Sequence, residues 1–525
     1  MKDFISRRPR LLKGILVLAL LIPSSFVLHG CTDLGEDTFG IVTPDQFYET
    51  DEQIISALAP VYSQFRSLLW SYHNLSQVSS DETLVPTRGS DWFDGGRWLA
   101  IHRHTWDPGL SDLNGAWIDT YTGIARANGL LQILEEAGNT DAALNAEIRA
   151  LRAFYYFVLL DLFGNVPIVG DDEFVIDAEN PPATESRSAV HSFVVSELTA
   201  AVPDLPAQWS GSNQGRLTKG AANAMLATLH LNANVFTNNS SEINTSGPNP
   251  CGQSDCQSAI AAADAVINSG LYSLLSDFHG NFAVANANSP EFVMEVQHLN
   301  QPGLGVNFPH RALHYNQGSP SPWNGFSTLA HVYNAFDEDD ARRDIFLIGQ
   351  AVNYETGEEV DNRQGEPLIF TPEINDVTNA TEGEGIRILK FPFDVDNDGG
   401  NHGHDYAWWR LSEMYLIKAE ALNEINGPTQ EVVDLINLVR ERAFDPDKPI
   451  ALSDYPDKAS MRDRIMNERL FELTYEARRR QDLVRAGKFT APWDFKERLD
   501  GHLVLFPIPQ TQLDANPNLT QNPGY

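Results

Sequence analysis

The chain has 525 residues, 42% of them hydrophobic, and its 71 Asp and Glu against 37 Lys and Arg give a formal net charge of −34 at pH 7. So acidic a protein repels a phosphate backbone, which excludes nucleic acid as a partner. The length allows about two to four domains. No stretch has the composition of a linker, so we expect one elaborated domain.

An export signal is predicted at the amino terminus. Five basic residues between Lys2 and Lys13 precede an apolar run over 14–28, which Pro23 interrupts. A membrane-spanning helix needs about 20 apolar residues, so this run is too short and is typical of a secretory signal. Removal of residues 1–30 would leave 32 basic and 70 acidic side chains, a net charge near −38.

A lipid anchor is predicted at Cys31. This cysteine directly follows Gly30 at the end of the apolar run, which resembles the bacterial lipobox. Lipobox processing attaches diacylglycerol to the sulfur and cleaves before the cysteine, so Cys31 would become the first mature residue and residues 31–40 a flexible tether. The alternative is an ordinary signal peptide with a coincidental cysteine, because His29 is unusual before the glycine.

The two remaining cysteines, Cys251 and Cys256, lie in a polar stretch. Export to an oxidising compartment favours a disulfide between them. Because the loop is short, the bond would mainly rigidify the chain locally. Two free thiols are the alternative.

Amphipathic helices are predicted along much of the chain, because apolar residues recur three and four positions apart. Alanines such as Ala221 and Ala224 share these faces with large residues, so neighbouring helices can approach closely. The pattern favours a mainly α scaffold of stacked helix pairs. Tetratricopeptide repeats have a period of about 34 residues, and no clean repeat of that length is detectable in the sequence. The predicted helices are 52–71, 115–137, 141–163, 189–202, 218–235, 257–268, 407–425, 429–442 and 460–477.

Three long irregular regions separate these helices, at 77–114, 289–334 and 351–405, and they are rich in Gly, Pro, Asn and aromatic residues. Loops of this length are uncommon in a folded domain unless they carry function. We therefore expect the functional surface to be built from loops.

Five stretches share the pattern of one known family. The most specific is AEIRALRAFYYFVLLDLFGNVPIV at 146–169, which ends in a Phe-Gly-Asn-Val-Pro exit. The others are AWIDTYTGIARAN at 116–128, GRLTKGAANAMLATLHL at 215–231, the segment from the helix around Glu420 through LVRERA to NERLFELTYEARRRQDLVRAGKF at 467–489, and the carboxyl end LFPIPQTQLDANPNLTQNPGY. Together with the lipobox they resemble the SusD/RagB family of outer-membrane nutrient-binding lipoproteins, over essentially the whole mature chain.

The resemblance implies a fold and a partner. It implies a mainly α fold, with tetratricopeptide-like helix pairs in a right-handed superhelical scaffold, long irregular loops and few short strands. The single domain would be 41–525, with a helix-pair half at 41–240, a loop-rich region at 241–406 and carboxyl-terminal helices at 407–525. It further implies a lipid anchor in the outer membrane, facing the cell exterior, and a SusC-like TonB-dependent transporter as partner.

Two residues depart from the family pattern. Ala477 stands where the family usually has Gly, and Arg480 stands where it usually has an aromatic residue. We expect these changes to affect only the packing near that helix. The charged residues of the motifs are expected to form structural ion pairs, namely Arg149, Arg152, Glu468, Arg469, Arg478 and Arg479.

Sugar binding requires flat apolar faces beside polar side chains, because a sugar ring alternates C–H patches with hydroxyl groups. Loop aromatics that meet this need occur near Trp92 and near Trp323. The predicted ligand-binding residues are Arg88, Trp92, Trp98, Tyr315, Trp323 and Asn324. The alternative for each aromatic residue is that it pins a long loop onto the helical body.

A calcium loop is a further hypothesis for DVDNDGGNHGHD, at 394–405. Its spacing places Asp394, Asp396, Asp398 and Asp405 at positions that ligate calcium in a twelve-residue loop, with a glycine at the sharp turn. Asp405 replaces the usual longer Glu. A solvated acidic loop is the alternative, and no other cofactor is expected.

We do not expect catalysis, because the sequence lacks the G-x-S-x-G, H-E-x-x-H, P-loop and dinucleotide glycine patterns. A glycosidase with paired carboxylates is the competing class, and a scaffold that binds only proteins is another. The function we predict is capture of an oligosaccharide at the cell surface and its delivery to the transporter. Capture of a peptide with the same transporter, as in relatives resembling RagB, is the alternative.

Overall fold

A computed structural model of the protein describes residues 50–170, 179 and 181–525. The chain divides into two compact units, Met1–Thr43 and Pro44–Tyr525, and every described residue belongs to the second. The predicted export signal, the lipid site Cys31 and the tether at 31–40 therefore lie outside the described residues.

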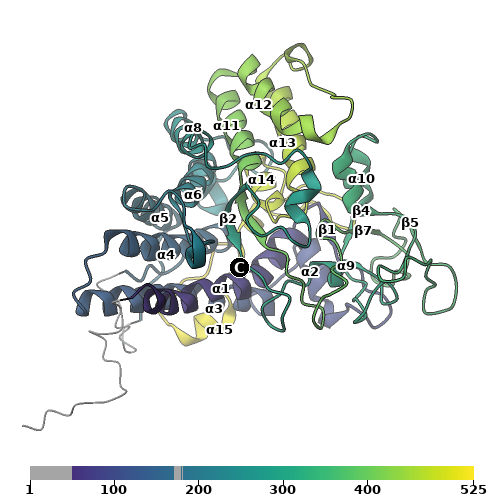
Figure 1. The fold of residues 1–525 in the computed structure, drawn as a ribbon, viewed down its shortest axis with the longest axis horizontal. Helices are drawn as coiled ribbons and strands as arrows, with labels where there is room; N and C mark the ends of the chain where they lie inside the picture. Colours follow the sequence, from purple (N-terminus) through teal and green to yellow (C-terminus); the bar gives the residue numbers. More distant parts are fainter. Residues whose placement is uncertain (1–49, 171–178, 180) are drawn as a thin grey trace, which may run out of the picture. The chain divides into compact units, whose positions relative to one another are not determined.

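The scaffold of the second unit is a series of helices in which each packs against the next (Figure 1). The contacts run from α1 through α3, α4, α5, α6 and α8 to α11, which contacts both α12 and α13. This succession confirms the predicted mainly α scaffold of stacked helices. The helices are α1 (Asp51–Val78), α3 (Ser111–Glu136), α4 (Ala142–Leu162), α5 (Arg187–Ala201), α6 (Lys219–Leu231), α8 (Gln253–Ile267), α11 (Leu411–Asn426), α12 (Gln430–Arg440) and α13 (Lys458–Leu473).

Capping side chains set the start of several helices. The Thr50 hydroxyl accepts a hydrogen bond from the Gln53 backbone N–H at 3.3 Å, and the Gln53 side chain accepts one from the Thr50 N–H at 3.0 Å. Asp141 caps α4 in a similar way. The first N–H groups of a helix have no partner inside it, so such a cap typically contributes about 1 kcal/mol.

The predicted helix at 407–425 was wrong at its start. Residues Tyr406–Arg410 form strand β8, and α11 begins only at Leu411. All five residues of β8 are buried. A short run that is apolar on both faces cannot be assigned to strand or helix by periodicity, which is the reason for the error.

Two other predicted helices are broken before their expected ends. The segment 460–477 is helical only to Leu473, because Tyr475 and Ala477 have φ angles of 67° and 58°. The segment 218–235 is interrupted at Asn232, after which the short helix α7 (Ala233–Phe236) follows. Neither break leaves a signal in the spacing of apolar residues.

Short antiparallel strands join the long irregular regions. A four-stranded sheet has the order β1 (Thr83–Leu84), β3 (Ser327–Thr328), β7 (Ile386–Ile388) and β4 (Phe346–Leu347). Strand β2 (Phe292–Val296) pairs with β8, and β5 (Gly349–Gln350) pairs with β6 (Ile369–Phe370). Because β1, β3 and β7 come from the three different regions, the sheet brings those regions together beside the helices, at the right of Figure 1.

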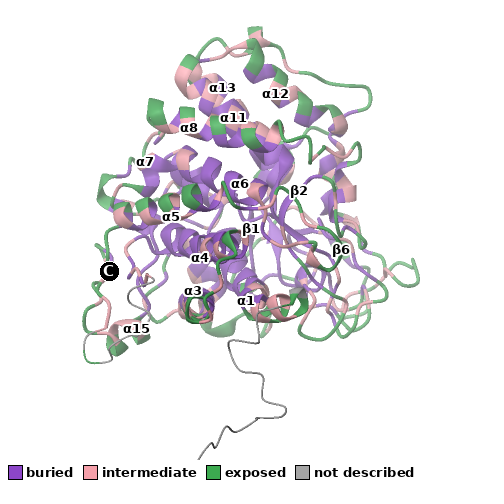
Figure 2. Cartoon of the chain, turned by 60° about the vertical axis from the view of Figure 1, so that its left-hand side comes forward, coloured by how far each residue is buried: buried purple, intermediate pink, exposed green. Residues whose placement is uncertain are grey.

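The core is centred on α4. Its residues from Ala150 to Leu162 are all buried, and α4 and α6 are drawn largely in the buried colour in Figure 2. The Phe154 ring lies 4.6 Å from Phe65 of α1 and 4.7 Å from Trp408 of β8, measured between ring centroids. Gly123 allows α3 to approach this helix closely, since a Cβ there would lie 2.4 Å from the Tyr155 ring.

A buried network of ion pairs joins α13 to the rest of the unit. Glu468 pairs with Arg342 at 2.7 Å and with Arg440 at 3.1 Å. Glu472, one turn later, contacts Arg342, Arg410 and Arg442. Lone buried charges are costly, and each of these two carboxylates is offset by several arginines.

The other motif arginines also form ion pairs, which confirms their predicted structural role. Arg152 and Arg149 pair with Glu197, Arg469 with Asp482, Arg478 with Glu413 and Arg479 with Asp81. Arg480, which departs from the family pattern, pairs with Asp161 at 2.9 Å and lies 5.0 Å from the Phe506 ring and 5.5 Å from the Phe489 ring. In the described part of the chain, no helix is long and apolar enough to cross a membrane.

Candidate functional site

The loop-built surface beside the four-stranded sheet contains Trp92 and Trp323, two of the predicted site residues. The Trp92 indole N–H donates a hydrogen bond of 2.6 Å to the Trp323 carbonyl. Gly325 makes this approach possible, because a Cβ at that position would lie 2.4 Å from the Trp92 ring. Both tryptophans are half-buried, so each is held by the protein while part of it remains in contact with solvent.

Tyr315 and Arg363 form the polar half of this surface. The Tyr315 hydroxyl donates a hydrogen bond of 2.6 Å to Asp91 Oδ2. Arg363 lies 3.0 Å from the same oxygen, and its guanidinium carbon lies 4.4 Å from the centroid of the Tyr315 ring. Burial and then the hydrogen bond to Asp91 raise the pKa of Tyr315, so its hydroxyl stays a donor at neutral pH.

Arg363 is anchored from behind by Glu382, to which its Nε donates a hydrogen bond. His314 Nε2 lies 2.9 Å from the other oxygen of Glu382. Burial by itself would raise the pKa of Glu382, but the hydrogen bonds from Arg363 hold it below its usual range. The carboxylate therefore stays charged and fixes the Arg363 side chain, 47% of which remains exposed.

A cleft of about 500 Å³ adjoins these residues. Its lining includes Arg363, Gln364, Glu366, Ile369 and Glu382. The volume falls within the range of about 300–1,000 Å³ that is usual for small-molecule sites. We call Asp91, Trp92, Tyr315, Trp323 and Arg363, with this cleft, the loop surface.

Three predicted ligand-binding residues are almost completely buried. Arg88, Trp98 and Asn324 are exposed by only 2%, 1% and 0% of their area. A ligand outside the protein cannot reach Trp98 or Asn324, whereas Arg88 forms part of the cleft wall despite its burial. The predictions of direct ligand contact were wrong for Trp98 and Asn324, and for Arg88 ligand contact stays a prediction.

The buried polar pair, Arg88 and Asn324, has a structural role. Arg88 Nε donates to the Asn324 carbonyl at 3.0 Å, and its Nη2 donates to the Glu384 carbonyl at 2.8 Å. The Asn324 side-chain oxygen accepts a hydrogen bond of 2.8 Å from Arg387. Burial lowers the pKa of Arg88 to about 10, yet it remains charged at neutral pH. These residues hold the loops from beneath.

Sequence reasoning missed Arg363 at the loop surface, and it did not single out Trp70, an exposed aromatic residue outside that surface. Arg363 lies in a tight turn inside the region 351–405, where no local pattern distinguishes it from its polar neighbours. Trp70 lies on α1, is 37% exposed, and covers the buried Arg311 guanidinium at 3.8 Å. A large aromatic residue on the polar side of a predicted helix was the available signal for Trp70.

The predicted calcium residues do not come together. Asp405 Oδ1 accepts a hydrogen bond of 2.8 Å from the His298 N–H, while Asp394 Oδ1 accepts one of 2.9 Å from the Asp396 N–H. The backbone of Asp398 pairs with that of Asn401 across a tight turn. Within residues 50–170, 179 and 181–525, no group of three or more His, Cys, Asp or Glu side chains is placed to hold a metal ion. The four aspartates therefore do not form the ligand set that their spacing predicted.

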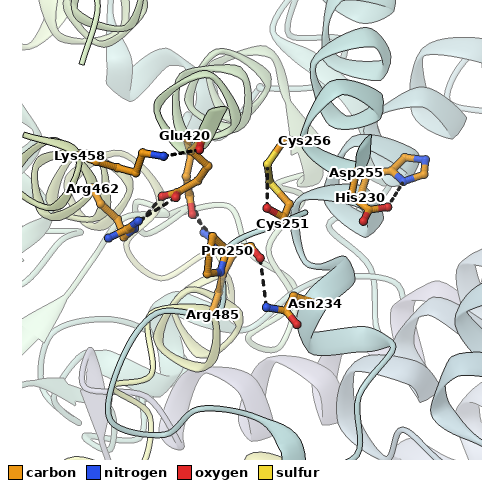
Figure 3. The surroundings of a disulfide bond; sticks show 11 residues. His230, Asn234, Pro250, Cys251, Asp255, Cys256, Glu420, Lys458, Arg462 and Arg485 are labelled. Atoms are coloured by element: carbon orange, nitrogen blue, oxygen red, sulfur yellow. Dashed lines mark hydrogen bonds and ion pairs between the residues drawn. A yellow bond between two sulfur atoms is a disulfide. The ribbon is translucent and has the colours of Figure 1, made fainter. Parts of the chain in front are cut away.

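The predicted disulfide between Cys251 and Cys256 is present at the start of α8 (Figure 3). The residues that precede it are held by Asn234, whose side chain donates a hydrogen bond of 3.2 Å to the Pro250 carbonyl, and by the Asn249 N–H, which donates one of 2.7 Å to the Arg485 carbonyl. The bond therefore rigidifies a segment that links α8 to the carboxyl-terminal helices.

The protein is a scaffold of successively packed helices, and its loops present an aromatic and polar surface. This arrangement places it in the class of helical binding scaffolds. Residues 238–525 match the SusD family, and residues 66–231 match a second group described as starch-binding associating with outer membrane. The first match alone spans more than half of the sequence. The chain belongs to the SusD family.

Two relatives illustrate this membership. The SusD-like protein P25 of Formosa agariphila is 24% identical over 98% of this chain and 99% of its own length. The starch-binding protein SusD of Bacteroides thetaiotaomicron is 26% identical over 80% of each chain.

Solved structures have the same fold. A laminarin-binding SusD-like protein is 25% identical with a TM-score of 0.70, covering 91% of this chain and 100% of the other. Surface glycan-binding protein A from Bacteroides thetaiotaomicron, in complex with laminarihexaose, is 21% identical with a TM-score of 0.71, covering 90% of this chain and 99% of the other.

Proposed function

We propose that this protein is a cell-surface lipoprotein that binds an oligosaccharide at the loop surface and does not transform it. The observation that carries the proposal is the placement of the half-buried Trp92 and Trp323 beside the hydrogen-bonded set of Tyr315, Asp91 and Arg363. The names of the relatives support it, because they are described as starch-binding, laminarin-binding and surface glycan-binding.

The chemistry of the loop surface suits a sugar. The aromatic rings offer apolar faces to the C–H patches of a sugar ring, and Arg363 and Gln364 offer donors to its hydroxyl groups. Asp91 accepts from Tyr315 and lies beside Arg363, so the rings and donors are held before a ligand arrives. Such preorganisation reduces the entropy lost on binding.

The cellular role rests on family membership and on the amino-terminal sequence. Lipid on Cys31 would hold the protein at the outer membrane, and the tether at 31–40 would keep it beside a SusC-like TonB-dependent transporter. The bound oligosaccharide would then pass to the transporter, which supplies the energy for uptake. Membrane fractionation of a Cys31→Ser variant and co-purification of the transporter with the native protein test these two steps.

Isothermal titration calorimetry of the full chain tests the binding function, with laminarin, soluble starch and a pool of short peptides as probes. We expect heat with at least one polysaccharide, and its loss in the Tyr315→Ala/Arg363→Ala variant. A control is Tyr455→Phe/Arg498→Ala, which alters a tyrosine and an arginine in the carboxyl-terminal part of the chain, away from the loop surface. Binding of peptides alone, or unchanged binding in the double variant, would contradict the proposal.

A further inference from the structure

A second groove lies away from the loop surface, between the first half of α1, the segment 207–218 and strand β2. It consists of two adjoining hollows of about 200 and 170 Å³. None of the loop-surface residues lines either hollow. The two hollows share Tyr62, Phe65, Gln214, Gly215, Arg216 and Glu295, so they form one groove, which we call the α1–β2 groove.

Two aromatic rings at this groove have fixed orientations. The Trp209 indole N–H donates a hydrogen bond of 3.0 Å to the Leu217 carbonyl. The Tyr272 hydroxyl lies 3.3 Å from the Thr218 hydroxyl. Both rings are half-buried. Because their polar atoms are held by the protein, little side-chain freedom is left for a ligand to remove.

Hydrogen bonds to a buried carboxylate hold Arg216 and Tyr62 in place in the groove. Arg216 Nε donates to Glu147 Oε1 at 3.0 Å, and its guanidinium carbon lies 3.9 Å from the Trp209 centroid. Tyr62 donates to the same carboxylate and accepts a hydrogen bond of 2.7 Å from the Leu217 N–H. Glu147 is fully buried, so it serves Arg216 and Tyr62 and not a ligand.

The rim supplies uncharged polar groups. Gln208, Gln214 and Asn288 are exposed there, and each carries an amide that both donates and accepts. Glu295 adds a carboxyl group, and burial, followed by the nearby Asp405, raises its pKa to about 7. Near neutral pH this carboxyl is protonated for part of the time. Arg66 adds a guanidinium at the smaller hollow, where it donates a hydrogen bond of 3.2 Å to the Gln297 carbonyl. The groove therefore combines flat apolar faces with hydrogen-bonding groups that are mostly neutral.

We propose that the α1–β2 groove is a second carbohydrate-binding site, which takes a segment of a neutral oligosaccharide. Trp209 and Tyr272 contact the C–H faces of the sugar rings, and the amides of Gln208, Gln214 and Asn288 bond its hydroxyl groups. A purely apolar ligand would leave these amides without partners, which is unfavourable. The proposal rests on the proposed carbohydrate function and adds a second binding site to it. The test of this site does not depend on the loop surface.

The test uses the full chain carrying Tyr315→Ala/Arg363→Ala, in which the loop surface is impaired. The protein is labelled with 5-fluorotryptophan, and the Trp209 fluorine resonance is assigned with Trp209→Phe. Laminarihexaose, maltohexaose, cellohexaose and mannohexaose are added at millimolar concentration. We expect at least one of them to shift the Trp209 resonance. Calorimetry with that sugar should then show affinity about fivefold weaker after Gln214→Ala, the effect of one lost hydrogen bond.

Gln430→Ala is the matched control, because Gln430 is an exposed glutamine on α12 outside the groove, and it should leave the affinity unchanged. No shift of the Trp209 resonance with any of the four sugars, or a shift with short peptides only, would overturn the proposal. If the double variant binds sugar as well as the native chain and Trp209 responds, the groove stands and the loop-surface assignment fails.

Discussion

The Tyr315 hydroxyl donates a 2.6 Å hydrogen bond to Asp91 Oδ2 and so joins two loops that are 224 residues apart in the sequence. Asp91 also lies 3.0 Å from Arg363, which comes from a third loop. This one carboxylate therefore aligns an aromatic ring and a guanidinium on the loop surface. Loops positioned by a rigid scaffold are a common way to build a binding site.

Removing only that hydroxyl should weaken sugar binding. We expect Tyr315→Phe to raise the Kd for laminarin or soluble starch by about threefold to tenfold, since one hydrogen bond typically contributes about 0.5–1.5 kcal/mol. Calorimetry measures the change. Tyr455→Phe removes a hydroxyl in the carboxyl-terminal part of the chain and should bind as the native protein does. Equal affinities in both variants would show that the Tyr315–Asp91 bond does not organise the site.

The buried ion network makes a prediction about stability. Glu472 is fully buried, which by itself would raise its pKa, but Arg442, Arg410 and Arg342 hold that pKa well below its usual range. Glu472→Gln leaves the charges of these arginines uncompensated, so we expect a loss of about 3–5 kcal/mol in the free energy of unfolding. Urea denaturation measures the loss, and the exposed Glu441→Gln is the control. A loss below about 1 kcal/mol would contradict the network's role.

Ala477 has a φ of 58° and is fully buried, at a position where the family usually has Gly. An alanine in this left-handed region is strained by about 1–2 kcal/mol, which Gly would relieve. The substitution also removes the buried methyl group, which is destabilising. The two effects oppose each other, so we expect Ala477→Gly to leave the free energy of unfolding nearly unchanged. Ala421→Gly, at a fully buried alanine inside α11, has no strain to relieve and should cost about 1–2 kcal/mol. Equal costs at the two sites, measured by urea denaturation, would be inconsistent with strain at Ala477.

Glu82 predicts a pH dependence of stability. Burial raises its pKa from 4.5 in the unfolded chain to about 7 in the folded protein. The folded state therefore binds the proton more tightly, which stabilises the folded protein. This contribution to the free energy of unfolding is complete below pH 4.5 and is lost as the pH rises to about 7. The loss amounts to about 3 kcal/mol.

Glu82→Gln removes this titration. The free energy of unfolding of the variant, relative to that of the native protein, should therefore be greater at about pH 8 than at about pH 5. Gln can still accept the hydrogen bonds that Glu82 receives from Gln77 and the Tyr475 N–H. Urea denaturation of both proteins at the two pH values measures the difference. A stability difference that does not vary with pH would show that Glu82 titrates normally in the folded protein.

The sequence determined the scaffold, because the information for a helix is local. The apolar periodicity of α4 and caps such as Thr50 and Asp141 lie within a few residues of the elements that they specify. The structural role of the motif arginines could be predicted for the same reason, because a cation on an apolar helix face needs a carboxylate partner. The family membership followed from these local patterns as well.

Only the tertiary structure decided which loop residues meet the solvent. Trp92 and Trp98 lie six positions apart in the same aromatic stretch, yet Trp92 is half-buried at the surface and Trp98 is 1% exposed, packed against Phe326. Arg88, which the sequence placed at the ligand, is buried, whereas the Arg363 side chain, which the sequence did not distinguish, is 47% exposed. Burial in an irregular region depends on contacts between segments hundreds of residues apart, and no local spacing encodes those contacts.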